Sequence, residues 1–77
     1  MVLMKNIRLT NGVISASCFI EGDESRSFMI KLDSNSFVVL ENSLGLSNTY
    51  SRMAVNKIRN TYTREGMLPD ELISVWC

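Results

Sequence analysis

Hydrophobic and polar side chains alternate along the first half of the chain, and each alternating run ends at a turn sequence. The run at residues 5–10 is followed by Asn11-Gly12 and then by a second run at residues 13–20. Asn-Gly between alternating runs favours a two-residue turn, because both positions must adopt a positive φ angle. We therefore expect a hairpin whose hydrophobic sides coincide. The predicted pairs are Thr10 with Val13, Leu9 with Ile14, and Ile7 with Ala16.

Two further runs, residues 27–32 and residues 37–41, follow polar turns and continue the same pattern. Phe28 shares a face with Ile20 only if the loop between their strands has an odd number of residues, three or five, since side chains alternate across a strand. The four runs together predict a four-stranded antiparallel meander. In its last hairpin, the predicted pairs are Leu32 with Phe37 and Ile30 with Val39.

The spacing of hydrophobic residues changes to a helical period after residue 48. Ser47, Asn48 and Thr49 are all good N-caps, and Gly66 is the usual residue after a helix C-terminus, so we expect a helix over residues 49–65. One side of this helix should pack on the sheet. That side is formed by Tyr50, Ala54, Ile58, Thr61 and Tyr62, with Met53 and Val55 at its edges.

Residues 72–76 read as a last strand, placed at a sheet edge or beside the first strand. The predicted fold is therefore α+β, a single domain over residues 1–77 with the order ββββαβ. One helix can cover only one face of the sheet, and the other face is not cleanly polar as a solvated antiparallel sheet would be. Its apolar residues are Val13, Phe19, Met29, Val38 and Leu40.

Two interpretations of that outer face stay open. The C-terminal segment could fold over it, or the five residues could be scattered and harmless, since single exposed apolar side chains are normal. Alternatively, the face forms a sheet-to-sheet homodimer or binds a protein partner, because a patch of a few hundred Å2 is near the size that implies an interface. A short chain has a small core, and a dimer would add to it.

Length and composition indicate the compartment in which the protein is expected and the state of its cysteines. The chain has 77 residues, no net charge and no apolar run long enough to span a membrane, so we expect a soluble cytoplasmic protein. Cys18 and Cys77 do not form a disulfide framework and are expected to be reduced thiols. Met4 offers an alternative start, which would make the first three residues dispensable.

Several chemistries are disfavoured by the residues present. The sequence contains no histidine, which excludes histidine bases and histidine metal sites, and two distant cysteines cannot hold a structural zinc. The acids at Glu21, Asp23 and Glu24 are best explained by a solvated turn. We therefore expect no catalytic, cofactor-binding or metal-binding residues, with an enzyme using carboxylates alone as the least favoured option.

The helix carries a concentration of positive charge. Arg52 and Arg59 lie seven residues apart on its outer side with Asn56 between them, and Lys57 and Arg64 form a second pair. This side is an ordinary solvated surface or, alternatively, a site for anions and nucleic acid that uses Arg52, Asn56 and Arg59. The preferred function is a non-catalytic interaction or regulatory protein, homo-oligomeric or bound to a protein partner; the alternative is a nucleic-acid-binding regulator.

Overall fold

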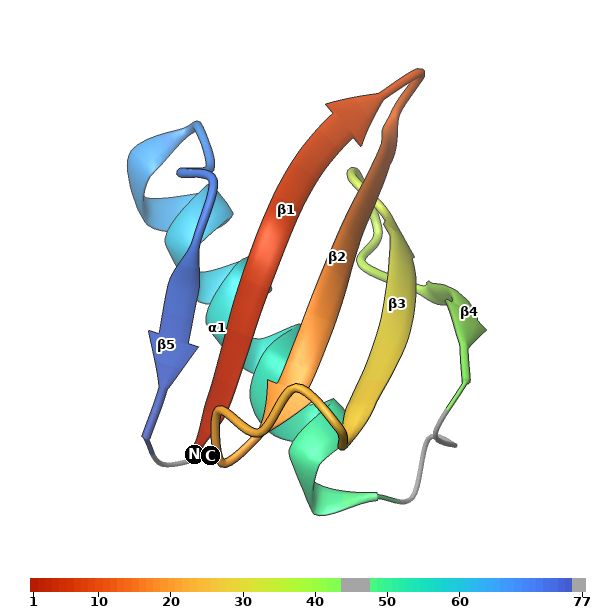
Figure 1. Ribbon diagram of the computed structural model, residues 1–77. Coiled ribbons are helices and arrows are strands. Elements are labelled where there is room, and N and C mark those ends of the chain that lie inside the picture. Colours follow the sequence, from red (N-terminus) through yellow and green to blue (C-terminus); the bar gives the residue numbers. More distant parts are fainter. Residues whose placement is uncertain (44–47, 76–77) are drawn as a thin grey trace.

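A computed structural model describes residues 1–43 and 48–75. Within these residues, a five-stranded antiparallel sheet packs one face against a single helix (Figure 1). The order of strands in space is β4-β3-β2-β1-β5, so the last strand lies beside the first and forms one edge. The predicted α+β fold with the order ββββαβ is confirmed. The elements are β1 (Val2–Thr10), β2 (Val13–Ile20), β3 (Ser27–Asp33), β4 (Val39–Asn42), α1 (Thr49–Glu65) and β5 (Leu72–Ser74).

The first hairpin turns at Asn11-Gly12, as the sequence predicts, with φ angles of 52° and 77°. The pairs of Thr10 with Val13 and of Leu9 with Ile14 are confirmed. Leu9 is nevertheless 49% exposed, because the tip of this hairpin extends past the helix that covers the rest of the face (Figure 1).

The predicted pair of Ile7 with Ala16 is wrong, because β1 contains a bulge. The register shifts between Arg8, which pairs with Ser15, and Lys5, which pairs with Ser17. Asn6 lies inside this irregularity with a φ angle of 54°, a left-handed conformation that asparagine tolerates better than most residues. The extra residue reverses the alternation of side chains along the first part of β1.

That reversal brings the N-terminal residues into the core. Val2 and Met4 are fully buried and pair with Ile20 and Cys18 on β2. The strand therefore begins at Val2 and not at Lys5, and the burial of Val2 argues against the expectation that the first three residues are dispensable. The buried hydrophobic core consists of Val2, Met4, Ile7, Ile14, Ala16, Cys18, Ile20, Phe28, Ile30, Leu32, Met53, Ala54 and Ile58.

The loop between β2 and β3 has the odd length that the pattern requires, counted from the last hydrogen-bonded pair. The backbone N–H of Ile20 donates to the carbonyl of Arg26 at 2.9 Å, and five residues, 21–25, lie between these two. Cys18 then pairs with Phe28, and both side chains are buried on the helix-covered face.

The predicted register of the last hairpin is wrong. Phe37 has a φ angle of 59° and belongs to the turn, which is held by the Asp33 carboxylate. This carboxylate accepts hydrogen bonds from the backbone N–H groups of Asn35 and Ser36 and from the Ser36 hydroxyl. β4 consequently starts two residues later than expected. The observed pairs are Leu32 with Val39, Lys31 with Glu41, and Ile30 with Asn42.

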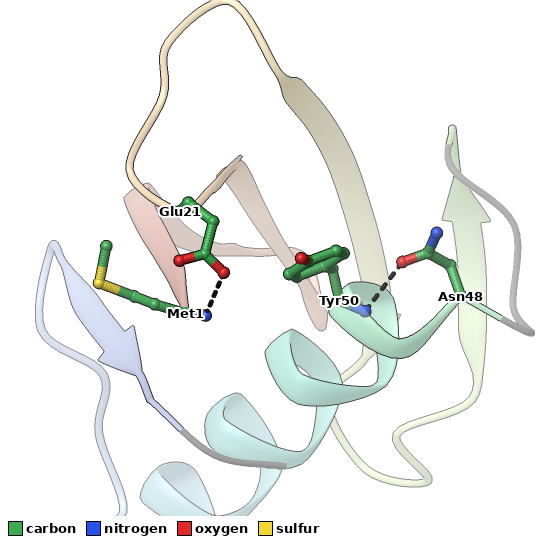
Figure 2. Close-up of polar contacts among 4 residues, drawn as sticks. All are labelled: Met1, Glu21, Asn48 and Tyr50. Carbon is green, nitrogen blue, oxygen red and sulfur yellow. Dashed lines mark hydrogen bonds and ion pairs between the residues drawn. The ribbon is translucent and has the colours of Figure 1, made fainter.

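Both predicted helix boundaries are confirmed. Asn48 is the N-cap, and its Oδ1 accepts a hydrogen bond from the Tyr50 N–H at 2.8 Å (Figure 2). Gly66 ends the helix with a φ angle of 75°, and its N–H donates to the carbonyl of Tyr62. Ala54, Ile58 and Thr61 are buried on the expected side, which positions the helix on the inner face.

An ion pair and a backbone hydrogen bond join Met1 to the β2–β3 loop. The Met1 amino group lies 2.8 Å from Oε1 of Glu21 (Figure 2). The Glu21 backbone N–H also donates to the Met1 carbonyl. The adjacent amino group, with a smaller contribution from Arg26, lowers the pKa of the Glu21 carboxyl.

Candidate interaction surface

The sheet face opposite α1 is left open by the elements that the structure describes (Figure 1). All five residues predicted there retain exposed surface. Val13 and Phe19 are partly exposed, whereas Met29, Val38 and Leu40 are 44%, 57% and 55% exposed. The large exposed fractions of the last three show that described residues do not cover this side.

The structure brings some of these residues together and separates others. Phe19 pairs with Ser27 and Met29 pairs with Ser17, so the two apolar side chains are diagonal neighbours on β2 and β3. Val13 lies at the opposite end of β2, next to the hairpin turn. Val38 precedes β4 and Leu40 lies on it, so both belong to the β4 edge of the sheet.

Sequence reasoning missed two members of this face, Leu3 and Ile73. Leu3 pairs with Phe19 on one side and with Ile73 on the other, so the three form a continuous row across β2, β1 and β5. We call Phe19, Leu3 and Ile73 the outer row. Ile73 is 51% exposed. Its position could not be predicted because it depends on the bulge at Asn6 and on the pairing of β5 with β1.

Charged groups lie beside the outer row and between it and the β4 edge. The Lys5 ammonium lies 5.9 Å from the centre of the Phe19 ring, within the range of a cation–π contact. Towards the β4 edge, Lys31 and Glu41 form an ion pair at 3.5 Å. An apolar centre with a polar rim is the arrangement found at protein interfaces.

The basic side of α1 is divided into separate contacts. The Arg59 guanidinium donates to Oδ1 of Asn56 at 3.0 Å, and Arg64 pairs with Glu65. Arg52 is exposed, and no carboxylate within residues 1–43 and 48–75 forms an ion pair with it. The predicted group of Arg52, Asn56 and Arg59 lies along one side of the helix, because these positions are spaced four and three residues apart.

A pocket of about 140 Å3 lies between β4 and the first half of α1. Arg52 and Asn56 line it, and this is the place where the predicted anion-binding residues meet a concave surface. Among the described residues, its lining consists of Val39, Asn42, Ser51, Arg52, Val55 and Asn56.

The remaining candidate groups have structural explanations. The Asp23 carboxylate accepts hydrogen bonds from the Ser25 N–H and hydroxyl, as expected for a turn, and these bonds lower its pKa. Cys18 is fully buried, and desolvation raises its pKa to about 12, which suppresses the nucleophilic thiolate. Trp76, Cys77 and most of the loop before α1 lie outside the described residues.

The part of the chain that the structure describes contains no cluster of three or more histidine, cysteine or acidic side chains able to hold a metal ion. Its helix is neither long nor apolar enough to cross a membrane.

Comparison of the chain with models of protein families, with curated proteins and with solved structures gave no match.

Proposed function

We propose that this protein is a non-catalytic interaction module that forms a homodimer through the open face of its sheet. The observation that carries the proposal is the outer row of Phe19, Leu3 and Ile73, which continues diagonally to Met29. Burying such a row removes apolar surface from water, which is the main favourable contribution to association.

The dimensions of the face support a partner that covers it completely. The strands are up to nine residues long and number five in the described chain. Their lengths are nine, eight, seven, four and three residues, so at about 3.3 Å per residue and about 4.8 Å between strands the face measures roughly 500 Å2 in outline. A stable interface takes about 800 Å2 of accessible surface from each partner, so sheet-to-sheet contact would have to use the whole of this face and the side chains at its edges.

The charge of the chain favours a second copy as that partner. The net charge is zero, so two copies experience no overall electrostatic repulsion when they approach. A two-fold interface also pairs the same patch with itself, and an apolar row with a mixed-charge rim is compatible with that arrangement. Sheets packed in this way stand about 10 Å apart with interdigitated side chains.

The oligomeric state tests the proposal directly. Light scattering at increasing concentration should give twice the 8.7 kDa chain mass for the wild type. Phe19→Lys places a charge in the outer row on the central strand of the sheet and should return the mass to that of one chain. Thr63→Lys adds the same charge on an exposed position of α1 and should leave the dimer intact.

A wild-type mass of one chain at millimolar concentration would remove the homodimer. A Phe19→Lys variant that stays dimeric would move the interface away from the outer row.

The nucleic-acid alternative rests on one specific observation, the alignment of Arg52, Asn56 and Arg59 along the exposed side of α1. Such a regulator should bind a heparin or DNA column in a salt-dependent manner, and Arg52→Ala/Arg59→Ala should lose retention. Passage of the wild type through the column at low salt would exclude this alternative.

A further inference from the structure

The pocket between β4 and α1 is a second feature, separate from the open sheet face. Its volume of about 140 Å3 is close to that of an engineered protein cavity that holds benzene, so it accommodates an organic group of about six non-hydrogen atoms. Four of its residues come from two successive turns of α1, and the other two come from β4. Regular secondary structure therefore fixes the whole described lining.

The lining is divided between apolar and polar groups. Val39 and Val55 are half-buried and pack against the hydrophobic core, which gives the pocket an apolar wall. Ser51 is buried and its hydroxyl donates to Oδ1 of Asn42 at 3.4 Å, so these two polar side chains are oriented towards each other. Arg52 and Asn56 are one helical turn apart on the remaining side.

The charge of this pocket is positive. The Arg52 guanidinium has no ion-pair partner among the residues that the structure places, so it can accept an incoming anion without breaking an existing pair. The Oδ1 atom of Asn56 accepts a hydrogen bond from Arg59, so the amide N–H₂ group of Asn56 is the part that can donate to a ligand. Glu41, on β4, pairs instead with Lys31 across the sheet.

We propose that this pocket binds a small organic carboxylate. The hydrocarbon part lies between Val39 and Val55, and the carboxylate meets the Arg52 guanidinium and the Asn56 amide. Arginine matches a carboxylate with two parallel N–H···O bonds. A phosphate ion could form the same bonds with arginine, but it would make no contact with the apolar wall of the pocket. Pocket size limits the ligand to a short chain.

Pentanoate is a suitable probe, and pentanamide is its uncharged isostere. Titration of the 15N-labelled protein with pentanoate should produce saturable shifts in the amides of residues 39, 42 and 51–56. Pentanamide and acetate should each bind about tenfold or more weakly, because one lacks the charge and the other lacks the hydrocarbon chain.

Two variants with the same charge change separate the pocket from the general charge of the helix. Arg52→Gln should weaken pentanoate binding about tenfold or more, whereas Arg64→Gln, whose arginine pairs with Glu65, should leave it unchanged. The amide spectrum of each variant shows whether it is folded. The proposal is overturned if Arg52→Gln binds pentanoate like the wild type, if inorganic phosphate binds as well as pentanoate, or if pentanoate causes no saturable shift.

Discussion

The ring of Phe37 meets the ring of Tyr62 edge to face, with centroids 6.2 Å apart and planes inclined by 73°. This contact joins the β3–β4 turn to the last part of α1. It also explains why a bulky residue is kept at a φ angle of 59°, where a side chain is normally unfavourable. Packing of the ring offsets the backbone strain.

Substitutions at Phe37 should separate packing from strain. Phe37→Ala loses the ring and keeps a Cβ at positive φ, so it should lower the free energy of unfolding by about 2–3 kcal/mol. Phe37→Gly loses the same ring but relieves the strain, and should be about 1 kcal/mol more stable than Phe37→Ala. Urea denaturation measures both. If the glycine variant is the less stable of the two, strain at this position is negligible.

The bulge in β1 makes a clear prediction for Asn6. Asn6→Gly should leave the stability nearly unchanged, because glycine adopts the observed φ angle of 54° without penalty. Asn6→Val should cost about 1–2 kcal/mol, since a β-branched side chain is strongly disfavoured there. Thermal or urea unfolding of the two variants provides the comparison, and equal stabilities would argue against the bulge.

Val2 and Leu3 are adjacent but should respond differently to truncation. Val2 is fully buried, so Val2→Ala should cost about 2 kcal/mol. Leu3 faces outward in the outer row, and in a monomeric background carrying Phe19→Lys its replacement by alanine should cost less than about 1 kcal/mol. Removal of residues 1–3 should destabilise the fold more than either change. A larger loss for Leu3→Ala than for Val2→Ala would show that the alternation is not reversed.

The Asp33 turn should make stability depend on pH. Hydrogen bonds from Ser36 and Asn35 lower the pKa of Asp33 below its ordinary value. The stabilisation is therefore present above the ordinary aspartate pKa and is lost as pH falls through the lowered folded-state pKa. Carboxyl NMR titration measures this pKa. Asp33→Asn should reduce the loss of folding stability at acidic pH. If the variant loses as much stability as the wild type, other carboxylates cause that loss.

The Cys18 thiol should be protected in the folded protein. In a Cys77→Ser background, its reaction with a disulfide reagent at neutral pH should be about a hundredfold or more slower than in urea, because labelling requires opening of the core. Burial raises its pKa to about 12, so its contribution to stability is complete below the ordinary thiol pKa and is lost as pH rises towards 12. Fast labelling without denaturant would contradict a buried position.

Local sequence signals predicted those parts of the fold that local chemistry determines. Asn11-Gly12 specified the first turn, and Asn48 and Gly66 specified both ends of α1, because each residue type suits the backbone conformation at its own position. The odd loop between β2 and β3 also followed from alternation alone.

The errors arose where one residue interrupts an otherwise regular alternation. Asn6 and Phe37 both adopt positive φ. Asn6 lies within an alternating run with no turn sequence before it, and Phe37, although it follows a turn sequence, is a residue type that rarely adopts this conformation. Each changes the register of the strand beside it, so Ile7 lost its predicted partner and Phe37 moved out of β4. The site was affected in the same way, because Leu3 and Ile73 join the outer face only through the altered register and the pairing of β5.

The pairing of β5 with β1 has a consequence for how the protein is made. Val2 pairs with Ser74, so β1 leaves the ribosome well before β5, the strand that becomes its second neighbour in the sheet. Until then one edge of β1 is open to other chains, and contacts this distant in sequence form slowly. Nascent chains should therefore be vulnerable to misassembly until β5 has been synthesised.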